Sequence, residues 1–365
     1  MSATLERPRT SPVDLSETID TRLFGAKLTT LEPEMAAVVA AINQDSASMI
    51  ETGPTIEVAA ETKSAAPAIV GPGLFGAAAW WTWLFGANLI AAVMVGATFG
   101  FVYSFQSAAS GEVLTGSQLE QKVTNAPTFA LWLGLVTTTL IVGSVRWRMK
   151  ASVPTLKLPR PAELALLLSI VIPLFIVSLS VYEVTEAAWN FTYAHLPASY
   201  QSALSFLKGD AIVKELTTEM GSVNFLLLFM TVAVFPAVAE ESIFRAAIGR
   251  GLISRYGVVA GIVLTSLLFG LAHIYPAHVA SAFVLGLVAH VVYRITQNFS
   301  APLLVHFLNN AMITALGSLA ACFATDTATE DFTIWPYGIP AAAWVITAVY
   351  LMHRNRVPAA KLVAA

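Results

Sequence analysis

A series of long apolar segments constrains the fold of this chain more than any other feature of its sequence. The segments begin near residue 80 and approach or reach the roughly 20 residues that cross the hydrocarbon core of a bilayer. Only 12% of the residues are charged, whereas soluble domains carry about 25%. Backbone groups in lipid must be satisfied within their own segment, so we predict an all-α, polytopic membrane protein of about eight transmembrane helices. The expected spans are approximately 80–105, 128–145, 162–181, 223–248, 258–274, 279–293, 302–322 and 337–352.

Lysine and arginine are distributed unevenly among the connections between these spans. If the spans simply alternate, the basic clusters after the second, fourth, sixth and eighth spans all fall on one side. The opposite connections are mainly acidic. The positive-inside rule then predicts a multi-pass protein of the cell membrane with both termini in the cytoplasm. The net charge of −3 gives no indication of a nucleic-acid partner, and with Cys322 as the only cysteine no disulfide within the chain is possible.

The chain divides into four parts by composition. Residues 1–73 are rich in Ala, Thr, Ser, Glu and Pro, which is typical of a disordered or linker-like cytoplasmic extension. Residues 74–160 hold two transmembrane helices, residues 161–353 hold the remaining spans, and residues 354–365 form a short cytoplasmic tail.

Charged residues lie inside the fourth span, in the stretch F-P-A-V-A-E-E-S-I-F-R-A-A at 235–247. A charge at the centre of a bilayer costs roughly 2.5–3.5 kcal/mol on insertion scales, so such groups pair with one another or face a polar cavity. Glu241 and Arg245 are four residues apart on one helix face, which predicts an ion pair. Glu240 points about 100° away from Glu241 and is left to face something else. The Glu241–Arg245 pair can also be read as a purely structural one.

Two further polar pairs lie in later spans at the same spacing. Phe269 and His273 share one helix face, and so do His306 and Asn310. Together with Glu240 they supply a carboxylate, two imidazoles and a carboxamide. Amide hydrolysis needs a base for water, an acid for the leaving nitrogen and donors for the oxyanion. The set is sufficient for that chemistry without a serine or cysteine nucleophile.

These motifs resemble those of the CPBP (ABI, CAAX prenyl protease-like) family of intramembrane glutamic endopeptidases. E-E-S-I-F-R at 240–245 is similar to the family's E-E-x-x-x-R motif, F-G-L-A-H at 269–273 to F-x-x-x-H, and H-F-L-N-N at 306–310 to H-x-x-x-N. The three motifs follow in the family's order, and residues 161–353 would be the protease core. The resemblance implies that Glu240 and His273 activate water, that His306 and Asn310 form the oxyanion site, and that Glu241, Arg245 and Phe269 support them. Asn309 is the alternative to Asn310, which the spacing favours.

The function expected on these grounds is an intramembrane endopeptidase that acts on a membrane-associated or prenylated CAAX-type protein or peptide, without a cofactor. One alternative keeps the reaction but makes it zinc-dependent, with Glu240, His273 and His306 as metal ligands. Another is a non-catalytic bacteriocin-immunity or scaffold protein. A third is a proton-coupled transporter, since intramembrane carboxylates and imidazoles also build proton relays.

Overall fold

Helices make up most of the part of the chain that the structure describes. The computed structural model describes residues 71–126, 128–149, 156–207, 225–323 and 333–356. No strand occurs within these ranges, which confirms the predicted all-α class. The expected extension at 1–73 therefore falls almost wholly outside the described residues, as does the tail after residue 356. The helices are α2 (Leu74–Ser110), α3 (Gly116–Thr124), α4 (Phe129–Met149), α5 (Pro161–Ala194), α6 (Ala198–Ala203), α8 (Phe225–Phe229), α9 (Phe235–Glu241), α10 (Arg250–Tyr256), α11 (Val258–Leu271), α12 (Pro276–Thr296), α13 (Ser300–Phe323) and α14 (Gly338–Arg354), with short turns η4 (Ser205–Leu207) and η7 (Trp335–Tyr337) and two π-helical segments, η5 (Met230–Val234) and η6 (Ser242–Gly249).

Six helical segments of the described chain are long and apolar enough to cross a membrane. They are Leu74–Ser110, Phe129–Met149, Pro161–Ala194, Phe225–Tyr256, Pro276–Thr296 and Trp335–Arg354. The expected fifth and seventh spans correspond to shorter apolar helices, Val258–Leu271 and Ser300–Leu316. A polytopic membrane protein is thus confirmed, whereas the predicted number of eight spans is not.

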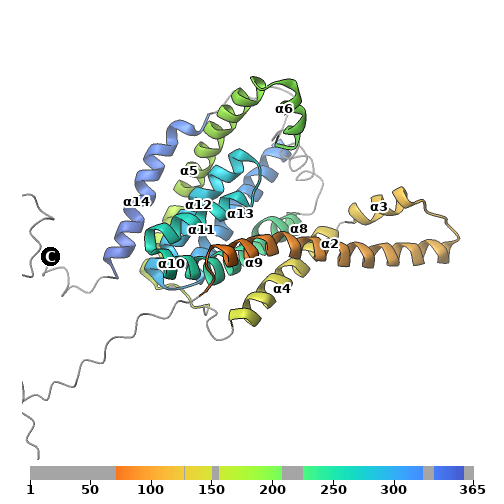
Figure 1. Cartoon of the computed structure of the whole chain (residues 1–365), viewed down its shortest axis with the longest axis horizontal. Helices are drawn as coiled ribbons and strands as arrows, with labels where there is room; N and C mark the ends of the chain where they lie inside the picture. Colours follow the sequence, from red (N-terminus) through yellow and green to blue (C-terminus); the bar gives the residue numbers. More distant parts are fainter. Residues whose placement is uncertain (1–70, 127, 150–155, 208–224, 324–332, 357–365) are drawn as a thin grey trace, which may run out of the picture. The chain divides into compact units, whose positions relative to one another are not determined.

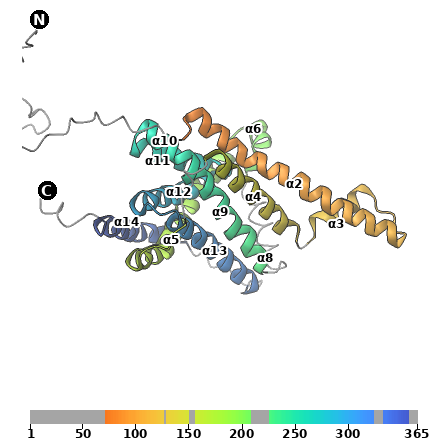
Figure 2. The same ribbon diagram turned by 90° about the horizontal axis from the view of Figure 1, so that it is seen from below.

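The long helices pack around α5 and α12. Helix α5 contacts α12, α13 and α14, and α12 also packs along α11 (Figures 1 and 2). Helix α2 lies against α4, and its second half carries α3, which folds back on it (Figure 1). The helix that runs through α9 contacts α4 on one side and α13 on the other. The segment with the acidic pair is therefore enclosed between helices from both halves of the chain.

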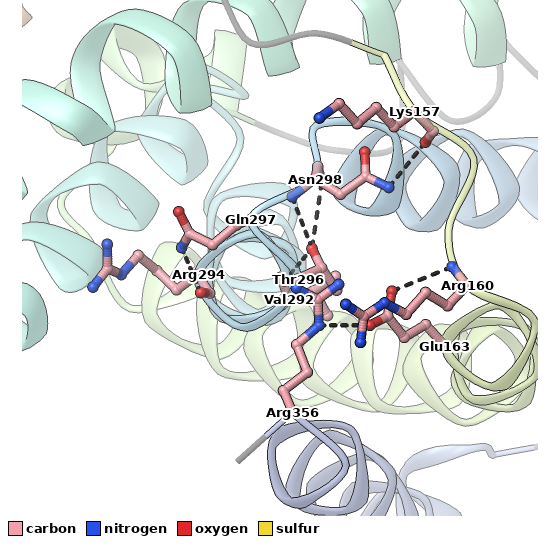
Figure 3. A network of polar contacts seen from close by, with 9 residues as sticks. All are labelled: Lys157, Arg160, Glu163, Val292, Arg294, Thr296, Gln297, Asn298 and Arg356. Carbon is pink, nitrogen blue, oxygen red and sulfur yellow. Dashed lines mark hydrogen bonds and ion pairs between the residues drawn. The ribbon is translucent and has the colours of Figure 1, made fainter. Parts of the chain in front are cut away.

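A polar network joins several helices at one end of this bundle (Figure 3). Glu163, in the first turn of α5, accepts a hydrogen bond from Arg356 just after α14, at 2.5 Å, and one from the backbone N–H of Arg160. Asn298, between α12 and α13, donates to the carbonyl of Lys157 at 2.9 Å. Arg294 lies at the same end (Figure 3). Basic residues from the connection between α4 and α5, from the last turn of α12 and from the segment after α14 thus gather at one end, as the alternating topology predicts. Which side of the membrane this end faces stays a prediction.

Candidate active site

Two π-helical segments flank the helix that carries the acidic pair. Helix α9 ends at Glu241, η5 precedes it and η6 follows it, so that α-helical geometry is interrupted on both sides. π-Helical turns inside α-helices are often found at functional sites because they turn side chains away from the regular 3.6-residue spacing. Pro236, in the first turn of α9, lacks the N–H that a regular helix would donate to the carbonyl of Val232.

Glu241 and Arg245 form the ion pair that their spacing predicts. Arg245 Nε lies 3.0 Å from Glu241 Oε2, and both side chains are fully buried. The guanidinium carbon also lies 5.2 Å from the centre of the Phe269 ring, within the range of a cation–π interaction. The two opposite charges therefore face each other, but Glu241 Oε2 and the three guanidinium nitrogens make no hydrogen bond within the described structure.

His306 lies between the two glutamates. Its Nδ1 is 3.1 Å from Glu241 Oε1, and its Nε2 is 3.9 Å from Glu240 Oε2. A carboxylate paired with arginine only accepts hydrogen bonds, so Nδ1 carries the proton and donates to Glu241. This hydrogen bond holds the imidazole in one orientation, with Nε2 on the side of Glu240. No local pattern in the sequence indicates this contact, because it joins helices 65 residues apart.

Of the two glutamates, only Glu240 has a partly exposed side chain. Its side chain is 18% exposed, whereas Glu241 is fully buried. Its Oε2 is itself buried and has no hydrogen-bond partner among the described residues. The gap of 3.9 Å to His306 is too long for a direct hydrogen bond.

Asn310 contacts the backbone carbonyl of Val232, which has no regular helical donor because residue 236 is proline. The Asn310 amide donates to Val232 O at 3.2 Å, from α13 to η5. Side chains of neighbouring helices commonly satisfy backbone groups freed by proline within a membrane. A proline inside the fourth span is thus the one sequence feature that could have indicated this contact. Asn309 is buried, whereas Asn310 is half-buried, and Asn309 Oδ1 has no partner in the described structure.

His273 lies in a different environment from the one expected. Helix α11 ends at Leu271, so His273 stands in the turn before α12 and is exposed, rather than lying late in an apolar span. The helix ends early because the chain turns through Ile274, whose φ is +61°, before Pro276 begins α12. Its Nδ1 lies 3.1 Å from the carbonyl of Phe269. Within the described chain, His306 rather than His273 is the imidazole that approaches the Glu240 carboxylate.

The Phe269 ring joins the parts of the site. It is fully buried, and its centre lies 5.4 Å from the rings of both His273 and His306. The Phe244 ring packs against it edge-on at 5.1 Å. The residues of all three motifs therefore meet around one phenyl ring. The short α11 and the π-helical breaks allow this meeting, which straight helices with equal ends would not.

The zinc alternative requires Glu240, His273 and His306 to converge. Within the described residues, no three His, Cys, Asp or Glu side chains form a group that could hold a metal ion. Glu240 and His306 approach each other, but His273 does not join them. The arrangement of donors thus does not fit a His₂Glu metal site.

The comparisons with known proteins agree with the motifs. Residues 222–312 match the family described as type II CAAX prenyl endopeptidase Rce1-like. This region contains α8 to α12 and the part of α13 that holds His306 and Asn310. Neither the curated proteins nor the solved structures gave a significant match. The match covers residues 222–312 of the 365-residue chain, and over these residues the sequence is similar to the CPBP, CAAX protease-like family.

Proposed function

We propose that this protein is an intramembrane endopeptidase that hydrolyses a peptide bond of a membrane-associated or prenylated CAAX-type protein or peptide by water activation at Glu240. The family match supports a CAAX-type protease at the level of the family. The observation that carries the finer proposal is the Glu240 carboxylate, with Oε2 unpartnered within the described chain and 3.9 Å from an imidazole whose other nitrogen is already held.

The proposed reaction assigns a proton movement to each of these groups. Glu240 takes a proton from a water molecule as the water oxygen attacks the scissile carbonyl carbon. The tetrahedral intermediate collapses with cleavage of the C–N bond, and the leaving nitrogen receives that proton. The products are a carboxylic acid and an amine; the acid then gives its proton to the amine or to water. His306 Nε2 faces Glu240 and can take part in the transfer of the proton that Glu240 receives from water. Glu241, which is paired with Arg245, keeps the His306 ring from turning.

Asn310 and His273 border this centre with different tasks. The Asn310 amide has two N–H groups and uses one on Val232, so the second can donate to an oxyanion. His273, exposed in the turn beside Phe269, is the proposed second imidazole for the water or the leaving group. Catalytic hydrogen bonds are often long before substrate binds, so a contact formed only with substrate is consistent with this role.

Mass-spectrometric comparison of protein termini tests the activity even though the substrate is not chosen in advance. Cells that express the native chain should contain cleaved termini that are absent from cells with Glu240→Gln, and the uncut precursors should accumulate in the latter. Glu120→Gln is the matched control, because Glu120 is an exposed glutamate of α3. Precursors that accumulate equally with both variants, or with neither, would contradict the proposal.

A purified assay separates the protease from the other classes. The protein reconstituted in liposomes is given a fluorogenic farnesylated CAAX peptide. General base catalysis contributes about 10²–10⁴-fold, so Glu240→Gln should lower kcat by at least about 100-fold. A scaffold protein would cleave no peptide, and a transporter would give proton flux without cleavage. A substrate named by the termini experiment replaces the peptide if that peptide stays uncut.

A further inference from the structure

A second polar cluster lies beside the turn that carries His273. It consists of Tyr182 and Glu186 on α5, and Tyr275 and His278 at the start of α12. Glu186 Oε1 accepts hydrogen bonds from the hydroxyls of Tyr182 at 3.1 Å and of Tyr275 at 3.2 Å. None of these residues belongs to the three motifs. The cluster joins α5 to the turn between α11 and α12.

The backbone of this turn is strained. Ile274 has φ of +61°, a region that β-branched residues rarely adopt. Its side chain is 57% exposed, so burial of that side chain does not compensate for the strain. Such a conformation persists where the surrounding structure holds it. The neighbouring residues must therefore supply the restraint.

Tyr275 contacts both the turn and α5. It directly follows Ile274, is 1% exposed, and its N–H bonds to the carbonyl of His273 at 2.6 Å. Its ring packs against Tyr182 at 6.2 Å and His278 at 5.4 Å between ring centres. Its hydroxyl reaches Glu186. The side chain is thus fixed from α5, while its backbone is bonded to His273 itself.

We propose that Glu186, acting through the Tyr275 hydroxyl, is a positioning residue that holds His273 beside Phe269 for the reaction. This inference rests on the proposed function and adds to it a restraint from a helix outside the three motifs. Glu186 and Tyr182 are four residues apart on the face of α5, so one helix supplies both the acceptor and a second donor. Both hydroxyls donate to Glu186, but only Tyr275 directly follows Ile274 in the turn.

Removal of single hydroxyls tests this role. Tyr275→Phe keeps the buried ring but breaks the bond to Glu186, and Tyr182→Phe is the matched control that breaks the other bond to the same oxygen. Misplacement of a catalytic group by about 1 Å can cost 10²-fold, so we expect Tyr275→Phe to lower kcat about tenfold with KM nearly unchanged. Tyr182→Phe should change kcat less than about twofold. Glu186→Ala should lower kcat as much as Tyr275→Phe does. Glu186→Gln should keep most of the native kcat, because its amide oxygen can still accept the hydrogen bond.

A double variant distinguishes positioning from a general loss of packing. In a His273→Ala background, Tyr275→Phe should cause no further loss of kcat, because the group that it positions is gone. Hydrogen exchange of the peptide that covers residues 272–279 should be faster in Tyr275→Phe than in the native protein and in Tyr182→Phe. An unchanged kcat in Tyr275→Phe, or losses that multiply in the double variant, would overturn the inference. If instead Glu240→Gln keeps full activity, the proposed function fails, whatever the tyrosine variants do.

Discussion

Glu241 Oε1 lies 3.1 Å from His306 Nδ1, although the two residues are 65 positions apart and on different helices. The same carboxylate is paired through its other oxygen with Arg245. A buried ion pair therefore does not stand alone in this protein but fixes an imidazole beside Glu240. That this arrangement supports catalysis at Glu240 stays a prediction.

Loss of Glu241 should destabilise the protein strongly. Glu241→Gln leaves the Arg245 charge fully buried and uncompensated, and breaking such a pair costs about 3–5 kcal/mol. Glu241→Gln combined with Arg245→Met removes both charges and should recover most of that stability. The free energy of unfolding is measured by titrating the purified protein, held in a mild detergent, with a denaturing detergent. The double variant should stay inactive, because His306 has lost its charged acceptor. Equal stability of the native protein and Glu241→Gln would show that this ion pair does not stabilise the protein.

Removal of metal ions should leave the peptidase activity intact. The expectation follows from the donor arrangement, because Glu240, His273 and His306 do not converge as a metal-binding group in the described part of the chain. The purified protein is dialysed against a chelator, its metal content is measured, and cleavage of the farnesylated peptide is followed with and without added zinc. Activity that disappears with the metal and returns only with zinc would replace the water activation proposed here by a metal-dependent one.

Those parts of the fold and site that depend on short-range geometry could be predicted from the sequence. Apolar segments of sufficient length become helices because lipid offers no other partner for their backbone. The i, i+4 spacing of Glu241 with Arg245, and of Phe269 with His273, correctly predicts their contacts. The predicted end of α11 lies three residues too late, because the helix ends at Leu271 and the chain turns through Ile274 with φ of +61°, which hydropathy does not indicate.

A single sequence does not specify which distant helices meet, although Pro236 marks the carbonyl of Val232 as one that needs another donor. The amide of Asn310 and the carbonyl of Val232 are 78 residues apart, and their meeting depends on how α13 packs against η5. The π-helical segments η5 and η6 also alter side-chain directions that regular α-helical geometry predicts. The roles of Glu240, His273, His306 and Asn310 therefore remain predictions that only activity measurements can test.

The small size of Gly249 should be essential for the packing around His290. A Cβ on Gly249 would lie 2.2 Å from His290 Cε1 and 2.8 Å from the carbonyl oxygen of Phe244. Overpacking of this kind costs about 1–3 kcal/mol, so Gly249→Ala should lower the unfolding free energy by that amount. Gly143→Ala in α4 is the matched control, because a Cβ there meets no described atom within 4 Å. The control should be neutral or slightly stabilising, since alanine favours helix more than glycine. Equal effects of both changes on stability would contradict the close contact.

Pro236 and Asn310 should be energetically coupled through the carbonyl of Val232. Pro236→Ala supplies a backbone N–H that can donate to this carbonyl, which Asn310 satisfies in the native protein. Asn310→Leu should therefore destabilise the native background by about 0.5–1.5 kcal/mol, the typical net contribution of a hydrogen bond, and the Pro236→Ala background by less. Unfolding free energies of the two single variants and the double variant give the coupling directly. Pro236→Ala should not restore activity, because the new N–H lies on another helix and cannot replace Asn310 as a donor to the oxyanion. Asn310→Leu should therefore be inactive in both backgrounds. Recovery of cleavage in the double variant would show that Asn310 serves only to satisfy the carbonyl that proline leaves open.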